Sequence, residues 1–208
     1  MSNLTRELFF SVPFFYCDVE NVDELNRKLV HNILKWKEED TERLAHSNKF
    51  SWHSQTDMNL RDEFHQITKI INDAQNEISI NEEYCSKSNL VVKDMWANVS
   101  QKYAYNSYHC HPNSLWSGVY YVQCPPNCGN IKFYNKDATT MWWPRYEKMD
   151  VSTRQSHQWD DIIYEPVEGR LILFLSHVGH EVSQNLTDVE GKDGYRISIS
   201  FNSIQKDK

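Results

Sequence analysis

Apolar residues recur at helical spacing in two parts of the first ninety positions. The first stripe, at intervals of four, four and three, consists of Leu25, Leu29, Ile33 and Trp36. The second, in a helix expected to begin near Leu60, consists of Phe64, Ile67, Ile71, Ala74 and Ile78. Residues at these intervals share one face of a helix, so each stripe is expected to pack against a core. Asn21, with Glu24 three positions later, is typical of a helix N-cap, and the polar residues 40–59 predict a loop or short helical turns.

The apolar period changes to two from Leu90 onward, which is the period of half-buried strands. The expected strands are Leu90–Val99, Tyr103–His111, Ser117–Gln123, Asn130–Tyr134, Arg170–Leu175, His180–Gln184 and Tyr195–Ser203. All six glycines lie at or after Gly118 and five of the six prolines at or after Pro112, so tight turns are concentrated in this half. Short strands separated by such turns predict an antiparallel sandwich or barrel.

Length and charge favour one folded domain of intracellular type. A chain of 208 residues can bury a sizeable core, and we expect a helical extension, residues 1–89, packed on a β-rich body, residues 90–208. The formal net charge of −7, without a Lys/Arg cluster, argues against a nucleic-acid partner. Because no apolar run reaches eighteen residues, no membrane span is predicted. Five cysteines, an odd number, fit reduced thiols in the cytoplasm better than a disulfide framework.

Three histidines are placed where they could share one metal ion. His109 and His111 lie two residues apart on an expected strand, so their side chains leave the same face. His180 follows the strongly apolar strand Arg170–Leu175, although His177 is near enough to take its place. Two ligands from one strand and one from a distant strand form the kind of metal site that leaves coordination positions open. An H-x-H pair alone is more often a surface or network pair, so this prediction needs support from elsewhere in the chain.

That support comes from the last expected strand, which alternates strictly. Its apolar face carries Ile197, Ile199 and Phe201, and its polar face carries Arg196, Ser198, Ser200 and Asn202. Four polar groups on one face of an apolar strand either face solvent or line a polar cavity, and the histidines in the same β body favour the cavity. A guanidinium matches a carboxylate with two hydrogen bonds, and the Ser198 hydroxyl can add a third. The sequence therefore predicts an anion site at Arg196.

These residues lie in stretches that resemble a known family. Trp96-Ala-Asn-Val, followed by His109-Cys-His-Pro-Asn-Ser-Leu-Trp-Ser-Gly-Val-Tyr-Tyr-Val, is similar to the pattern W-x-N … H-x-H-P-x-S-x-x-S-G-V-Y-Y of the 2-oxoglutarate/Fe(II)-dependent oxygenase family of bacteria and phages. Pro166-Val-Glu-Gly-Arg-Leu-Ile-Leu-Phe, then His180, then Arg196-x-Ser-x-Ser-Phe-Asn resemble the second half of the same family. The resemblance runs in order over residues 90–203, about half of the chain.

The resemblance implies both a fold and a chemistry. The fold is mostly β, a double-stranded β-helix (jelly roll, cupin-like) whose supporting N-terminal helices pack on one sheet. The implied enzyme is a non-haem iron dioxygenase, a hydroxylase that uses Fe(II), 2-oxoglutarate and O2. It couples decarboxylation of 2-oxoglutarate to succinate with oxidation of a small-molecule or peptide substrate. The expected location is the cytoplasm of a bacterial or infected host cell, and a homodimer is compatible with the sequence.

The resemblance also implies roles for individual residues. His109 takes the place of the first histidine of the superfamily's H-x-D/E … H triad and His180 that of the distal histidine. Arg196, with Ser198 beside it, takes the place of the residue that pairs with the far carboxylate of 2-oxoglutarate, and Tyr121 resembles a strand tyrosine that donates to the same carboxylate. Where the wider superfamily has a carboxylate, this chain has His111. Three neutral imidazoles leave an iron site more positive than two imidazoles and a carboxylate.

Two other functions are compatible with the residues. The first is a cupin-like, three-histidine dioxygenase or isomerase that works without 2-oxoglutarate, in which Arg196 binds the carboxylate of the substrate itself. The second is a non-enzymatic jelly-roll binding or structural protein whose histidines hold zinc or no metal. Succinate production separates the first from the leading hypothesis, and metal analysis separates the second.

Several other residues carry weaker signals. Cys110 alternates with the two histidines, so we expect it in the core. Cys124 and Cys128 have a spacing that zinc could use, but no second pair accompanies them. Three tryptophans could line a substrate groove or pack the helices against the barrel, and packing is slightly favoured: Trp116, Trp142 and Trp143. The remaining histidines are interpreted as surface or core-edge residues: His31, His46, His53, His65 and His157.

Overall fold

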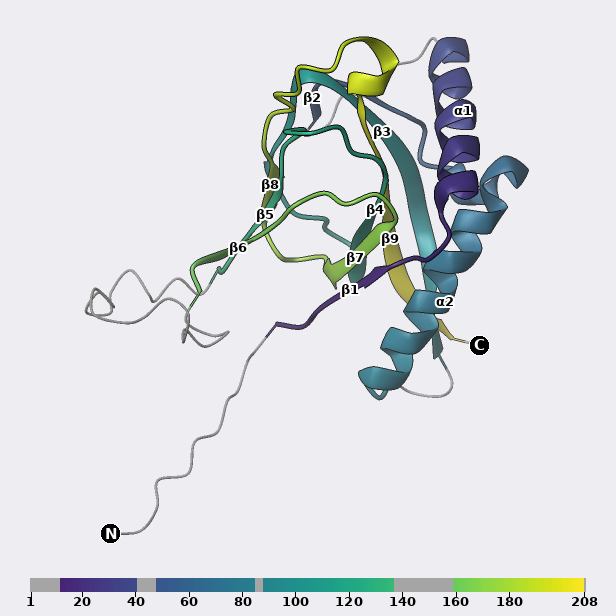
Figure 1. Cartoon of the computed structure of the whole chain (residues 1–208). Helices are drawn as coiled ribbons and strands as arrows, with labels where there is room; N and C mark the ends of the chain where they lie inside the picture. Colours follow the sequence, from purple (N-terminus) through teal and green to yellow (C-terminus); the bar gives the residue numbers. More distant parts are fainter. Residues whose placement is uncertain (1–11, 41–47, 85–87, 137–158, 208) are drawn as a thin grey trace, which may run out of the picture.

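The computed structural model describes residues 12–40, 48–84, 88–136 and 159–207. Its elements follow one another as β1 (Phe14–Asp18), α1 (Asp23–Glu39), β2 (Asn48–His53), α2 (His65–Asn81), β3 (Ser88–His109), β4 (Trp116–Gln123), β5 (Ile131–Tyr134), β6 (Asp161–Tyr164), β7 (Arg170–Leu175), β8 (His180–Val182) and β9 (Arg196–Asp207). Short 3-10 turns at Met58–Leu60, Asp62–Phe64 and Gly191–Gly194 complete the order. The strands curl into an incomplete barrel, and both helices lie on one outer side of it (Figure 1).

The sheet is antiparallel throughout, in the order β1-β7-β4-β9-β3-β8-β5-β6, with β2 paired to β3. The long strand β3 connects the two sides of the curl. Its first part, Ser88–Ser100, pairs with β9, whereas Asn106 and His109 pair with β8. Between these parts Tyr103 adopts a positive φ of 70°, which turns the strand from one partner to the other. The two strands expected at 90–99 and 103–111 are therefore one bent strand.

Alternation along the strands separates two apolar layers. One lies between the sheet and the helices and includes Leu29 and Ile71 from the helices with Ile199 from β9. The other lies inside the curl and includes Phe133 and Phe174. Burial of these side chains is the main favourable contribution to folding. Because the apolar face of β9 turns to the helices, its polar face turns into the curl, as the sequence predicts for a cavity.

Both predicted helices are confirmed, but their starts differ from the expectation. The first stripe, Leu25 to Trp36, is buried along α1. Its N-cap is Val22, without a side-chain cap, and Asn21 stands outside the helix at a φ of 54°, so the predicted Asn21 cap is wrong. The second helix begins at His65, because residues 58–64 form two 3-10 turns in its place. The missing cap shows that packing of the apolar face, more than end capping, holds α1 in position.

Three strands were not predicted from the sequence. β1 and β6 are the two outer strands of the sheet order, and β2 lies in the segment expected as a loop or short helical turns. β1 and β6 show no apolar alternation, since an outer strand needs only one paired neighbour and carries polar residues freely. β2 does alternate, but only through Phe50 and Trp52. The first 89 residues thus supply two strands as well as the helices, and the proposed division at residue 89 stays a prediction.

Two single-residue expectations have clear outcomes. Trp116 is fully buried between sheet and helices, and its indole N–H donates to the Tyr84 hydroxyl at 2.8 Å, so the packing role is confirmed. Cys110 is exposed, and the expectation of a core position is wrong, because β3 ends at His109 and alternation stops there. Trp142 and Trp143 lie outside the described residues. Neither described helix is long and apolar enough to cross a membrane.

Candidate functional site

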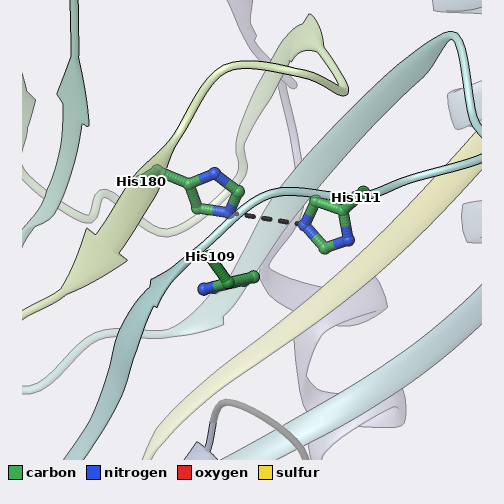
Figure 2. A group of neighbouring side chains, drawn as sticks. All are labelled: His109, His111 and His180. Carbon is green, nitrogen blue, oxygen red and sulfur yellow. Dashed lines mark hydrogen bonds between the residues drawn. The ribbon is translucent and has the colours of Figure 1, made fainter. Parts of the chain in front are cut away.

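Three imidazoles meet at the end of β3 (Figure 2). His109 ends β3, and its Cα partner across the sheet is His180, the first residue of β8. His111 lies beyond the strand, where its backbone N–H donates to the carbonyl of Ser176 at 2.9 Å. One ring nitrogen of each histidine lies within 4.8 Å of the others, and the Nε2 atoms of His111 and His180 are 3.4 Å apart. His177 is exposed and is not part of this cluster, so His180 is the distal member.

Backbone carbonyls fix the ring orientation of two of these histidines. Nδ1 of His109 lies 2.7 Å from the carbonyl oxygen of Ser107, and Nδ1 of His180 lies 3.0 Å from that of Val178. A carbonyl accepts only, so each Nδ1 carries the proton and donates it, which leaves Nε2 with a free lone pair. This is the arrangement that orients histidines as metal ligands.

The surroundings keep the cluster uncharged at neutral pH. Burial, with a smaller contribution from His109, lowers the pKa of His111 to about 4. Burial and, after it, the neighbouring His109 lower the pKa of His180 to about 3, against an opposing effect of the Val178 carbonyl and with the least contribution from His111. Burial also lowers the pKa of His109. Neutral imidazoles are the form in which histidine binds a metal ion.

The donor set fits a divalent transition metal. Two ligands in neighbouring positions of an octahedral ion, each about 2.1 Å from it, are about 3 Å apart, close to the 3.4 Å between the two Nε2 atoms. Imidazole is a ligand of iron, zinc, copper and nickel, so the donors alone do not select one metal. Among the described residues, these three histidines are the one set of three or more potential metal-binding side chains that lie close together. The set contains no carboxylate.

The histidines open onto a cavity of about 350 Å³ inside the curl. Its floor is a ladder of facing residues on β3 and β9, with the pairs Asp94–Asn202, Trp96–Ser200, Asn98–Ser198 and Ser100–Arg196. The cluster lies over the first part of this ladder, because the rings of His111 and Trp96 are 6.0 Å apart. The predicted polar face of the last strand therefore lines the same cavity as the three histidines.

Arg196 lies at the far end of this ladder and is 3% exposed. Its Nη1 donates to the backbone carbonyl oxygens of Cys128 and Ser183, the second at 3.2 Å. Within the part of the chain that the structure describes, no carboxylate pairs with the guanidinium. Burial lowers its pKa, but a guanidinium is basic enough to stay protonated. A buried cation with unused N–H groups beside a cavity is an anion-binding arrangement.

The two residues expected to assist Arg196 are next to it. Ser198 and Tyr121 are Cα partners across β9 and β4, and both line the cavity. Tyr121 is 2% exposed, and burial raises the pKa of its phenol, so the hydroxyl keeps its proton and can donate. The structure thus places all of the sequence-predicted site residues around one cavity.

Several cavity residues were given no role in the site by the sequence analysis. His53 was interpreted as a surface or core-edge residue, but it is buried, and its ring stacks on Trp96 at 5.3 Å. Asp94 and Asn98 lie on the inward face of β3, and the alternation of that strand, extended to its polar positions, was the signal that could have identified them. His31 and His65 are exposed, as expected, and His46 and His157 lie outside the described residues.

Comparison with known proteins decides the family. The sequence model described as "Putative 2OG-Fe(II) oxygenase" matches residues 94–202, slightly more than half of the chain. The chain belongs to this 2-oxoglutarate/Fe(II) oxygenase family. The matched range contains the three histidines and Arg196, and the family is one of non-haem iron enzymes with 2-oxoglutarate as cosubstrate. No curated protein sequence matches the chain.

Solved structures show the same fold at low sequence identity. A Pseudomonas putida prolyl-4-hydroxylase has a TM-score of 0.61 at 16% identity, over 92% of this chain and 93% of the other. A viral collagen prolyl hydroxylase from Paramecium Bursaria Chlorella virus-1, solved with 2-oxoglutarate, has a TM-score of 0.55 at 13% identity, over 91% and 94%. The carbocyclase SnoK from nogalamycin biosynthesis has a TM-score of 0.64 at 9% identity, over 92% and 79%. The double-stranded β-helix expected from the sequence is confirmed.

Proposed function

We propose that this oxygenase is a hydroxylase in which His109, His111 and His180 hold Fe(II) and Arg196 holds the distal carboxylate of 2-oxoglutarate. The observation that carries the proposal is the buried Arg196 guanidinium, which has no carboxylate partner among the described residues and lines the same cavity as the histidines. The unused N–H groups form a fork that fits a carboxylate. Iron, once bound, supplies the activation of dioxygen that side chains cannot perform.

The chain's own residues bind and orient the reactants. Backbone carbonyls orient the rings of His109 and His180, and with His111 these three imidazoles would hold the iron. The bound iron would supply the site at which 2-oxoglutarate is chelated and dioxygen is activated. Tyr121 and Ser198 are proposed to donate hydrogen bonds to the carboxylate held by Arg196. His111 is the proposed third ligand, because the cluster contains no carboxylate among the described residues.

The substrate is proposed to be a small molecule or a peptide that reacts in the cytoplasm. Two titrations test the function. Anaerobic addition of Fe(II) and 2-oxoglutarate should produce the visible metal-to-ligand charge-transfer band of the chelate. Addition of O2 should then yield succinate in proportion to the 2-oxoglutarate consumed.

Each alternative gives a different result. A three-histidine enzyme without 2-oxoglutarate would bind iron but show no such band and form no succinate. A non-enzymatic protein purified without chelators would contain zinc or no metal. Either result would refute the proposal.

A further inference from the structure

The cavity carries opposite charges at its two ends. Apart from the neutral histidines, the charged side chains among its described lining residues are Arg196 and Asp94. They lie six residues apart along the β3–β9 ladder, since Asp94 faces Asn202 and Ser100 faces Arg196. At about 3.3 Å per residue this is about 20 Å of strand. One end of the cavity is thus suited to an anion and the other to a cation.

The Asp94 end of the cavity shares one row of the sheet with a residue that contacts the histidine cluster. Asp94, Asn202, Ser117 and Phe174 form one row across four neighbouring strands. The Phe174 ring is 4.8 Å from that of His180, so the β7 end of this row lies beneath the cluster, and Asp94 stands at its β3 end. If 2-oxoglutarate extends from the cluster toward Arg196, the space at Asp94 remains for the molecule that is oxidised.

Asn202 is held in one orientation by a chain of hydroxyl groups. Ser117 Oγ donates to Oδ1 of Asn202 at 2.8 Å and lies 2.8 Å from Oγ of Ser176, whose backbone carbonyl accepts from the N–H of His111. Because Oδ1 is taken by Ser117, the NH2 group of Asn202 is the part left for the cavity. The row therefore offers a carboxylate acceptor and an amide donor on facing strands.

An indole lies beside this pair. Trp96 is the next inward residue of β3 after Asp94, and its ring is fixed by the stacked His53 at an interplanar angle of 14°. A cation near a tryptophan face is stabilised by the ring electrons. Lys93, the cation already near Asp94, lies 3.5 Å away with both side chains substantially exposed, and such a pair contributes little. The Asp94 carboxylate, although paired with Lys93, also lines the cavity and can accept a second cation there.

We infer that the substrate is an amine, whose ammonium group binds between Asp94 and Trp96 while Asn202 donates to an oxygen of the same molecule. The inference rests on the proposed function, because that function places 2-oxoglutarate at the opposite end. It assigns to the substrate a class that the family and the fold leave open. Asp94, Trp96 and Asn202 are specificity-determining residues, and none of them is proposed as a metal ligand.

The test uses two probes of nearly equal shape, n-butylamine and n-butanol, added anaerobically to the protein loaded with Fe(II) and 2-oxoglutarate. Binding is measured by ligand-observed NMR. The parent protein should prefer the amine, and Asp94→Asn should reduce amine affinity about fivefold, the upper effect of losing an ion pair at a partly exposed carboxylate, with n-butanol unchanged. Lys93→Met, the matched control, should retain or tighten amine binding, because it removes a competing cation. N-acetyl-L-lysine amide and free L-lysine then distinguish a peptide side chain from a free amine.

Three results would overturn the inference. The first is equal binding of the two probes by the parent. The second is an amine preference that survives in Asp94→Asn, as direct coordination of the amine to iron would produce. The third is a loss of amine binding in Lys93→Met as large as that in Asp94→Asn. Both variants should bind 2-oxoglutarate like the parent. Failure of the parent itself to bind 2-oxoglutarate would count against the proposed function. The amine preference is also measured with metal alone, so that the two failures can be told apart.

Discussion

Replacement of Arg196 separates cosubstrate binding from metal binding. The guanidinium is buried, and its Nη1 is occupied by the carbonyls of Cys128 and Ser183, which leaves Nε and Nη2 for a ligand. Arg196→Lys keeps the charge but loses the planar fork. Arg196→Met keeps much of the volume and loses both charge and donors. Neither change touches an imidazole, so iron affinity in the absence of 2-oxoglutarate should hardly change.

The expected magnitude follows from the burial of the pair. Removing one partner of a buried, hydrogen-bonded charge pair costs about 2–5 kcal/mol, or roughly 30-fold to several-thousand-fold in the dissociation constant. Arg196→Met should therefore weaken 2-oxoglutarate binding within this range. Arg196→Lys should recover only part of the loss, because an ammonium group makes one directed contact where the guanidinium makes two.

The assay pairs iron content with an anaerobic titration of 2-oxoglutarate, and thermal unfolding checks that each variant is folded. Arg170→Met is a matched control, since Arg170 lies on β7, pairs with Asp18 at 2.7 Å and does not line the cavity. The control should bind 2-oxoglutarate like the parent. A folded Arg196→Met protein with unchanged 2-oxoglutarate affinity would refute the cosubstrate assignment. One that also loses iron would show that Arg196 supports the barrel instead.

Three further substitutions test the site and the fold. His180→Ala should abolish iron retention, measured by metal analysis, whereas the exposed His177→Ala should retain it; full occupancy in His180→Ala would refute the ligand assignment. Gly118→Ala should destabilise the protein by about 3 kcal/mol in urea unfolding, because its Cβ would lie 2.3 Å from the Phe201 ring; an unchanged midpoint would contradict this packing. Leu29→Ala, in the core between α1 and the sheet, should cost about 2–5 kcal/mol while iron binding persists below the transition, and a loss under 1 kcal/mol would mean that α1 is dispensable.

Periodicity predicted the parts of the fold in which one face is buried over several turns or residues. The α1 stripe and the alternation of β9 are such cases, because each apolar position faces the same layer. The outer strands β1 and β6 lack this constraint and were missed. The N-cap at Asn21 was predicted from Asn21 with Glu24 three positions later, and the backbone there adopts a left-handed conformation that takes Asn21 out of the helix.

The histidine cluster was predicted for a partly incorrect reason. Two residues on one strand were expected to share a face, but β3 ends at His109, and a backbone hydrogen bond to Ser176 brings His111 back to the cluster. The same ending exposes Cys110, which strict alternation would have buried. Local spacing thus identified the right histidines, whereas their convergence depends on a contact between positions 111 and 176 that no local pattern contains.

Replacement of a superfamily carboxylate by His111 changes the charge that the cavity must balance. A divalent ion with three neutral imidazoles keeps its full double charge, whereas a carboxylate ligand would reduce it by one. With His111 as ligand, a dianionic 2-oxoglutarate faces both that charge and the cation of Arg196, so its binding is expected to depend strongly on the metal. The cavity's described lining contains one carboxylate, Asp94, and it lies at the end away from Arg196. That separation leaves the attraction between Arg196 and 2-oxoglutarate intact, and Asp94 offsets part of the metal's charge at the end where the amine is inferred to bind.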